Sequence, residues 1–236
     1  DPKTNQVVVT ADRTVSQAEW TKLTKVVDGL GEKAELKRTK GEFKLAIAGG
    51  DKITGPVTGG TVFCSLGFNV VKDGQPYFIT AGHCTNETSD WFDAGQELGF
   101  TEESSFPDND FGLVKYSENA DHPSEVNLYN GSTQTITKAG DAIIGQEVTR
   151  SGTTTQVHSG TVTNTDATVN YDTGDTVNGL IEADVCADHG DSGGPLFSGD
   201  TAIGLTSGIN GNCTSGGVTF FQPVTEALSA VGAQIG

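Results

Sequence analysis

The stretch Gly190-Asp191-Ser192-Gly193-Gly194-Pro195 sets one serine among three glycines and a proline. Small residues on both sides of a hydroxyl group let another polypeptide backbone approach it closely. They also allow neighbouring backbone amides to point at one spot, which is how proteins hold an anion. We therefore interpret Ser192 as an activated nucleophile. Composition alone favours the alternative, an ordinary glycine-rich turn in an all-β protein.

The composition predicts a mainly β protein. Thr, Val, Gly and Ser recur throughout the 236 residues, and long helical periods are rare. The length suits one or two compact domains. No apolar run reaches the roughly 18 residues that a spanning helix needs, so we expect no membrane association. The chain lacks Met and starts without a signal-peptide pattern, so we expect Asp1 to mark a processing boundary.

Charge divides the chain into two parts. Residues 1–46 hold 9 Lys and Arg against 7 Asp and Glu, a balance of +2, whereas residues 47–236 hold 5 against 24, a balance of −19. The sum is the net charge of −17. An acidic surface of this kind argues against nucleic acid or an anionic membrane as a partner.

The four cysteines Cys64, Cys84, Cys186 and Cys213 indicate an oxidising compartment, because their number is even. None forms a CxxC pair, so we expect no zinc site. Their spacing leaves all three possible disulfide pairings open.

Residues 1–46 also differ from the rest in periodicity. A strand is predicted over 6–10, and Ser16-Gln17-Ala18-Glu19 is a capping box that begins an amphipathic helix ending at Gly29. Two further strands, 34–39 and 42–48, predict a strand–helix–hairpin unit. We interpret this unit as a separate module that ends near Gly49-Gly50; the alternative is an ordinary N-terminal subdomain.

Beyond residue 60 the apolar residues recur with the spacing that is typical of β-strands. One strand is expected over 62–71, a returning strand over 77–80, another over 111–116, and several more down to 218–221. The only helix expected in this part is the tail, residues 224–231. Many short strands at this spacing indicate a sandwich or barrels.

His83 and Asp110 are the candidate partners of Ser192. His83 lies between an apolar strand and a cysteine, where a disulfide would fix the backbone of a general base. Asp110 begins the apolar run 111–114, and a carboxylate there needs a hydrogen-bond donor such as imidazole Nδ1–H. Asp108 is the rival carboxylate, although it lies in a predicted turn.

Together these residues resemble a known family. Thr80-Ala81-Gly82-His83-Cys84, then Asp110, then the Ser192 stretch give the His…Asp…Ser order of the chymotrypsin clan. Longer motifs resemble the streptogrisins, secreted bacterial serine endopeptidases. These motifs are Cys64-Ser65-Leu66-Gly67-Phe68-Asn69-Val70, Ser104-Ser105-Phe106-Pro107, Ala202-Ile203-Gly204-Leu205-Thr206-Ser207-Gly208 and Phe220-Phe221-Gln222-Pro223-Val224-Thr225-Glu226-Ala227-Leu228-Ser229-Ala230.

The resemblance implies two six-stranded antiparallel β-barrels with the site in the cleft between them, and no cofactor or metal. It implies that His83 is the base, Asp110 its orienting carboxylate and Ser192 the nucleophile, with the amides of Gly190 and Ser192 as the oxyanion hole. It further implies an ion pair of Asp191 with Arg150 and the disulfides Cys64–Cys84 and Cys186–Cys213. The residues that it implies for substrate binding are Ser207, Gly208, Ile209 and Thr219.

The resemblance also implies a precursor. Residues 1–46 match the end of a propeptide that assists folding and then blocks the cleft, with Phe43-Lys44-Leu45-Ala46 lying along it. Residues 47–236 match the protease domain, with barrels over about 47–132 and 133–236. Ile47-Ala48-Gly49-Gly50-Asp51 resembles the mature start, so cleavage is expected at Ala46–Ile47, with Leu45–Ala46 as the alternative.

The specificity pocket departs from the pattern. Ile209 stands where chymotrypsin-like members carry Gly, His189 replaces a proline, and Thr206 stands where glutamate-specific relatives carry histidine. We expect Leu or Phe at P1, the substrate residue before the cut bond. Expected partners are protein and peptide substrates, the chain's own propeptide and protein inhibitors of proteases, for a secreted, monomeric enzyme. The alternative function is a catalytically silent homologue that binds peptides or inhibitors.

Overall fold

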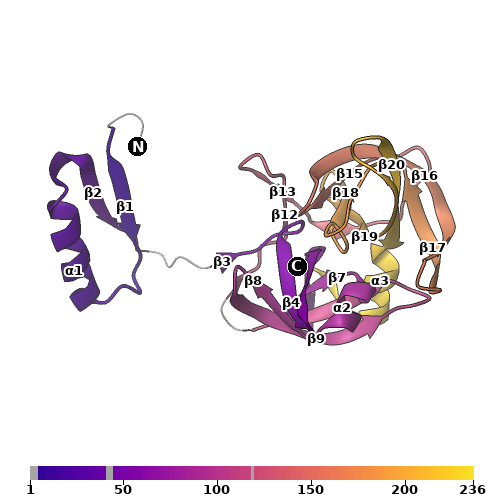
Figure 1. The fold of residues 1–236 in the computed structure, drawn as a ribbon, viewed down its shortest axis with the longest axis horizontal. Coiled ribbons are helices and arrows are strands. Elements are labelled where there is room, and N and C mark those ends of the chain that lie inside the picture. The colour runs from indigo at the N-terminus through magenta and orange to yellow at the C-terminus, as the bar shows by residue number, and fades with distance from the viewer. Residues whose placement is uncertain (1–4, 41–44, 118–119) are drawn as a thin grey trace. The chain divides into compact units, whose positions relative to one another are not determined.

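The structure is a computed structural model that describes residues 5–40, 45–117 and 120–236. It forms two units, Asp1–Leu45 and Ala46–Gly236. The first unit contains β1 (Val7–Ala11), α1 (Gln17–Asp28), the short 3-10 helix η1 (Gly31–Lys33) and β2 (Ala34–Arg38), drawn in indigo in Figure 1. The capping box forms as the sequence predicts: the Ser16 hydroxyl accepts from the Glu19 amide, and the Glu19 side chain accepts from the Ser16 amide.

The predicted hairpin of residues 34–39 with 42–48 is wrong, because among the described residues β2 and the end of the second strand, β3 (Leu45–Ala46), belong to different sheets. β2 pairs in parallel with β1, from Val7 opposite Ala34 to Ala11 opposite Arg38. Two parallel neighbours need a crossover connection, and α1 is that connection. Of the last predicted strand, residues 42–44 lie outside the described residues, and Leu45–Ala46 is the short strand β3. The expected position of Phe43 and Lys44 along the cleft likewise falls outside them.

The second unit begins with an eight-stranded sheet of order β21-β6-β7-β10-β9-β8-β4-β5. Its elements, with α2 among them, are β4 (Lys52–Val57), β5 (Gly60–Ser65), β6 (Phe68–Lys72), β7 (Gln75–Thr80), α2 (Gly82–Glu87), β8 (Asp90–Asp93), β9 (Gln96–Ser105), β10 (Phe111–Tyr116) and β21 (Gln234–Ile235). The sheet has two strands more than the expected six, and one of these is the C-terminal β21, which returns to pair with β6. The short strands β11 (Ala120–Asp121), β12 (Glu125–Asn127) and β13 (Thr133–Thr135) follow β10.

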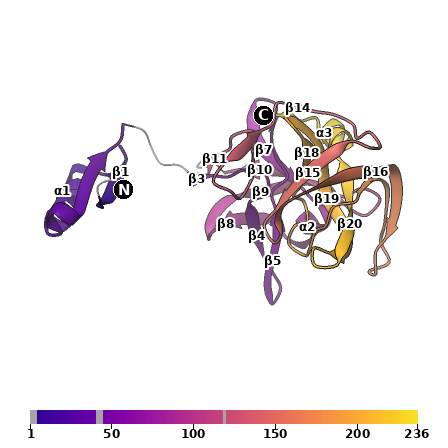
Figure 2. The same ribbon diagram turned by 90° about the horizontal axis from the view of Figure 1, so that it is seen from above.

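The second sheet has the order β14-β19-β18-β15-β16-β17-β20, and an additional pairing of β19 with β20 closes six of its strands into a barrel. Its elements are β14 (Lys138–Ala139), β15 (Glu147–Gly152), β16 (Gln156–Asn170), β17 (Thr176–Ala183), β18 (Pro195–Ser198), β19 (Thr201–Asn212) and β20 (Gly216–Pro223), followed by α3 (Val224–Val231). In Figure 2 these orange and yellow strands gather on one side of the unit with α3 beside them. Within the described residues, no helix is long and apolar enough to cross a membrane.

Two local predictions are wrong. The expected strand over 62–71 divides into β5 and β6 at Leu66 and Gly67, where Leu66 N donates to Asp51 O and Gly67 N donates to Ile79 O. The tail is not the only helix beyond residue 60, contrary to the prediction, because residues 82–87 form helix α2. Six residues without a side-chain cap give a weak helical pattern, so this helix escapes sequence reasoning.

The segment that begins at Ile47 is built into the second unit. Ile47 is fully buried, and its carbonyl accepts a hydrogen bond from Asn69 Nδ2 at 2.8 Å. The same Asn69 amide donates to Pro123 O at 2.7 Å, and Asn69 Oδ1 accepts from Tyr116 at 2.7 Å. Ile47 is therefore held by the barrel while the peptide bond before it is intact.

One apolar core joins the two sheets. It contains Phe68 and Leu113 from the first sheet, Phe197 and Leu205 from the second, and Val224 from α3. Because side chains of both sheets share this core, the segments that carry His83, Asp110 and Ser192 are fixed relative to one another.

Candidate active site

His83 and Asp110 form a close pair. His83 is the second residue of α2, and Asp110 directly precedes β10, where it is fully buried. His83 Nδ1 lies 2.8 Å from Asp110 Oδ2, and the His83 backbone amide donates to Asp110 Oδ1 at 2.8 Å. With Nδ1 bonded to the carboxylate, the imidazole presents Nε2 as its free proton acceptor.

Two residues of the second barrel hold the same aspartate. Ser207 Oγ donates to Asp110 Oδ2 at 2.5 Å, and the Asp110 amide donates to Gln222 Oε1 at 2.7 Å. Gln222 is fully buried and was not predicted as a site residue. The sequence signal for this role is that Gln222 is a polar residue inside the apolar stretch 218–224. A strand buries a glutamine only when the side-chain amide has a hydrogen-bond partner.

The surroundings of His83 favour its protonated form. Burial lowers its pKa, but the charge of Asp110 and the hydrogen bond to it raise the pKa further, and Glu87 adds to this. The net result is a His83 pKa above its ordinary value. Such a histidine is poised to accept a proton and to hold it for the duration of a reaction.

The turn that carries Ser192 depends on two glycines with positive φ. Gly190 has φ +97° and Gly193 has φ +79°, a region that side chains with a Cβ rarely adopt. The turn is also held from the first sheet: Ser65 N donates to Ser192 O at 2.8 Å, and Ser65 Oγ donates to Gly190 O at 2.9 Å. Ser65 lies within a quoted motif, but its role depends on a contact that only the folded chain makes.

The amides of this turn fall into two groups. The amides of Asp191, Gly193 and Gly194 donate to the carbonyls of Asp188, Thr206 and Asp191. Within the described part of the chain, the amides of Gly190 and Ser192 have no protein acceptor. Two neighbouring free N–H groups beside a serine hydroxyl are the donors that an oxyanion requires.

Asp191 and Arg150 form a buried ion pair beneath the turn. Both side chains are fully buried, and Arg150 Nη2 lies 3.2 Å from Asp191 Oδ2. Asp191 also accepts from the amides of Thr154 at 2.9 Å, Thr155 at 3.1 Å and Asp188 at 2.9 Å. Arg150 Nε donates to Cys186 O at 2.6 Å. The charges are therefore paired with each other and hydrogen-bonded, which burial demands.

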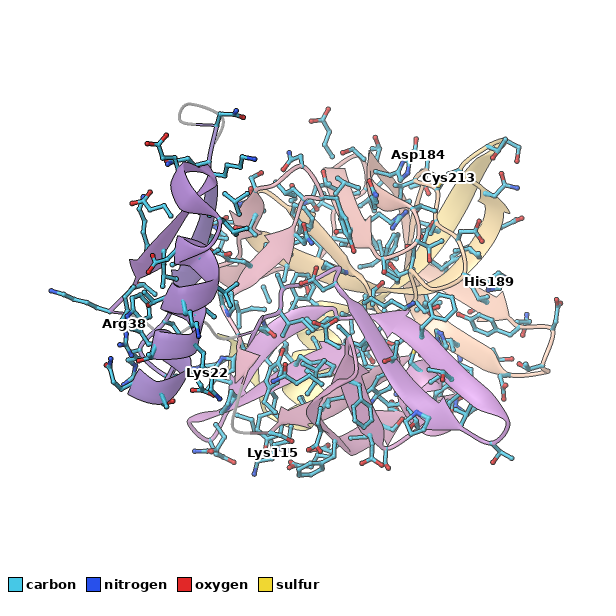
Figure 3. The ribbon with its side chains drawn as sticks, turned by 60° about the vertical axis from the view of Figure 1, so that its left-hand side comes forward. Lys22, Arg38, Lys115, Asp184, His189 and Cys213 are labelled. Atoms are coloured by element: carbon cyan, nitrogen blue, oxygen red, sulfur yellow. A yellow bond between two sulfur atoms is a disulfide. The ribbon has the colours of Figure 1, made fainter. Side chains whose placement is uncertain are left out.

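His83 and Ser192 line one cleft of about 720 Å³. Among the described contacts no hydrogen bond joins His83 Nε2 to Ser192 Oγ. Catalytic hydrogen bonds are often long or poorly aligned in structures without a bound substrate. Ser207, Gly208 and Ile209 line the cleft as well, and so does the exposed His189, labelled in Figure 3. The fully buried Thr219 is not among these lining residues, and its hydroxyl donates to Val185 O at 2.6 Å.

The structure contains the disulfides Cys64–Cys84 and Cys186–Cys213. The first ties α2 to β5 beside His83, and the second lies in the C-terminal barrel, where Figure 3 labels Cys213. Both groups of potential metal ligands among the described residues consist of one such disulfide and one histidine. Because disulfide sulfurs are not thiolates, these groups do not fit a metal ion.

Comparisons with known proteins agree with this geometry. The family model described as Trypsin matches residues 53–231, and the one described as Alpha-lytic protease prodomain matches residues 1–31. The chain is 66% identical to Streptogrisin-D of Streptomyces griseus over its full length, spanning 60% of that protein, and 51% identical to Streptogrisin-A of the same organism, spanning 76% of it. It is also similar to the structure of a glutamic-acid-specific serine protease, with 45% identity, a TM-score of 0.75, and coverage of 80% of this chain and 100% of that one.

We predict that Asp191→Asn destabilises the fold by about 3–5 kcal/mol, because it leaves the Arg150 charge buried without its partner. Urea unfolding, carried out in a Ser192→Ala background to prevent self-digestion, measures this loss. Asp200→Asn is the control, since Asp200 pairs with Lys138 at the surface, where both side chains are exposed, and the midpoint should not move. An Asp191→Asn midpoint equal to that of its parent would contradict the role given to the pair.

Proposed function

We propose that this chain, which belongs to the streptogrisin group of the trypsin family, is part of a secreted serine endopeptidase precursor in which residues 47–236 cut peptide bonds. One observation carries the proposal. His83 pairs with the buried Asp110 in the cleft that Ser192 lines, beside the free amides of Gly190 and Ser192.

In this mechanism Ser192 Oγ attacks the carbonyl carbon of the scissile bond while His83 Nε2 takes its proton. The carbonyl oxygen becomes an oxyanion that the Gly190 and Ser192 amides bind. Asp110 stabilises the imidazolium through Nδ1–H, and His83 then gives its proton to the leaving amine. Water, deprotonated by His83, next cleaves the acyl-enzyme and restores Ser192. Loss of one oxyanion donor typically lowers kcat about 10²–10³-fold.

P1 specificity is proposed to favour large apolar residues such as Leu and Phe. Thr206, Ser207, Gly208 and Ile209 form one wall of the cleft. The glutamic-acid-specific structure is described as using a histidine triad in substrate binding, whereas His83 and His189 are the only two histidines among the described lining residues here. The rim also carries Glu87, Asp172, Asp175 and Asp188, which oppose a glutamate side chain.

Residues 1–46 are proposed to be the end of a propeptide that assists folding and then inhibits the cleft until it is cut after Ala46, or after Leu45 as the alternative. The match of residues 1–31 to a prodomain supports this role. The two disulfides favour an extracellular location. We further propose that the mature part acts as a monomer on protein and peptide substrates and that protein inhibitors bind the same cleft.

We predict that a fluorophosphonate probe labels the matured chain at Ser192. Activated serine hydroxyls react with this reagent, so Ser192→Ala should abolish labelling and His83→Ala should slow it by at least about 10³-fold. Intact-mass spectrometry followed by peptide mapping locates the adduct. Ser132→Ala is the matched control, because Ser132 is exposed and bonds to Asn130, and it should label like the unaltered chain. A folded, matured chain that fails to label would instead support the catalytically silent binding protein.

We predict that peptide nitroanilides with Leu or Phe at P1 are cleaved with kcat/KM at least about tenfold above those with Glu or Arg. The branched Ile209 at the cleft wall should limit the largest rings, so Ile209→Gly should raise the Phe-to-Leu ratio, again by up to about tenfold. Steady-state kinetics on both proteins provide the comparison. A strong preference of the unaltered enzyme for Glu or Arg would overturn the assignment.

We predict that purified Ser192→Ala precursor remains uncut, because the chain's own serine performs the processing. The unaltered precursor, and Ser132→Ala as control, should release a chain whose first residue is Ile47, identified by N-terminal sequencing. Ala46 as the first residue would select the alternative bond. Normal maturation of Ser192→Ala with no other protease present would refute self-processing.

A further inference from the structure

Tyr171 is linked to Asp110 and to His83, in each case through one intervening side chain. It directly follows β16 and lines the cleft, with its hydroxyl oxygen 2.6 Å from Ser207 Oγ. Its ring makes an edge-on contact with Phe106 at 6.0 Å between centroids, and Phe106 makes the same kind of contact with His83 at 5.9 Å. Tyr171 is therefore joined to Asp110 through one hydroxyl and to His83 through one ring.

The direction of the hydrogen bonds follows from the number of protons. Ser207 has one hydroxyl proton, and it donates this proton to the acceptor Asp110 Oδ2. The short contact between Tyr171 and Ser207 must then use the proton of Tyr171. Burial raises the pKa of Tyr171 to about 12. The hydrogen bond to Ser207 lowers this pKa, and the charge of Asp110 raises it further. Tyr171 thus keeps its proton wherever a histidine-dependent protease works.

Both carboxylate oxygens of Asp110 already accept hydrogen bonds. Oδ2 accepts from both Ser207 and His83 Nδ1, while Oδ1 accepts from the His83 amide. A hydroxyl that accepts one hydrogen bond becomes a stronger donor in the next. The bond from Tyr171 therefore strengthens the bond from Ser207 and draws negative charge away from the oxygen that faces the imidazole.

We propose that Tyr171 is a positioning residue of the catalytic site, which donates to Ser207 and thereby holds Asp110 in the orientation and charge state that His83 requires. This inference rests on the proposed serine endopeptidase activity. Tyr171 acts through Ser207 and does not itself touch the reacting atoms. Its position was not predicted, because the contact joins residues 36 apart in sequence.

Other titratable groups also face His83, and their contribution has to stay constant in a test. Glu87 lies on the same helix, α2. Asp188 and His189 reach the cleft from the segment before Ser192, and Asp172 and Asp175 reach it from the segment after Tyr171. Replacement of Tyr171 by Phe removes one oxygen and leaves all these groups and the ring in place.

The test is Tyr171→Phe in the matured enzyme. Loss of one neutral hydrogen bond in the site should lower kcat about fivefold, whereas KM for a short peptide nitroanilide should change less than about twofold, because the ring that lines the cleft remains. Asp110 then carries more charge toward His83, so the pKa of His83 rises and the acid limb of kcat/KM moves to higher pH. The downfield proton resonance of His83 Nδ1–H should shift as well.

Two controls separate this role from a general effect. Tyr77→Phe removes a hydroxyl that bonds Glu102 at 3.0 Å, away from the cleft, and should change neither kcat nor the pH limb. In a Ser207→Ala background, the change Tyr171→Phe should have no further effect, because the chain of bonds is already broken.

The proposal is overturned if Tyr171→Phe leaves kcat and the acid limb unchanged, if it raises KM alone, or if it costs as much without the Ser207 hydroxyl as with it. Fluorophosphonate labelling of each variant shows that its site is folded. If the unaltered enzyme neither labels nor cleaves peptides, the proposed function fails; if it does both and Tyr171→Phe equals it, only the role of Tyr171 fails.

Discussion

The buried ion pair of Asp191 with Arg150 is the interaction on which the shape of the catalytic turn depends. Arg150 is the only arginine after residue 46, and it lies on β15, inside the C-terminal barrel. Its partner immediately precedes Ser192 and accepts hydrogen bonds from three backbone amides, those of Thr154, Thr155 and Asp188, so the pair anchors the residue before Ser192 to two other segments of the second unit. All these groups belong to the second unit. The turn therefore needs no free chain terminus to form.

The polar contacts of the site also join the two barrels. His83 and Asp110 come from the first barrel, whereas Ser192 and Ser207 come from the second. Ser207 and Gln222 bond Asp110 across this boundary, and Ser65 bonds the Ser192 turn in the opposite direction. The apolar core shared by both sheets sets the approximate distance between the barrels. These directional hydrogen bonds set the relative positions of His83, Asp110 and Ser192.

Sequence reasoning recovers the parts of this arrangement whose signals are local. The apolar run 111–116 and the helical tail 224–231 appear with the expected bounds, because pattern and burial agree there. Helix α2 is missed because six residues without a side-chain cap carry little periodicity. The parallel pairing of β1 with β2 is missed because a helix separates the two strands in sequence and no local pattern records which strands pair. Gln222 and Tyr171 escape because each acts on a residue 112 or 36 positions away, through an orientation that no local pattern records.

Hydrogen-bond satisfaction gives the most direct physical argument for where the substrate binds. Among the described residues, every buried side-chain nitrogen and oxygen has a partner. The turn at Ser192 follows the same rule for the amides of Asp191, Gly193 and Gly194, yet leaves those of Gly190 and Ser192 without a protein acceptor. In the proposed mechanism, the acceptor for these two free amides is the carbonyl oxygen of the substrate. Both amides belong to a turn with positive φ that a buried ion pair holds, so they are oriented before any substrate arrives. In the proposed mechanism, that prior orientation allows them to stabilise the oxyanion more than the carbonyl from which it forms.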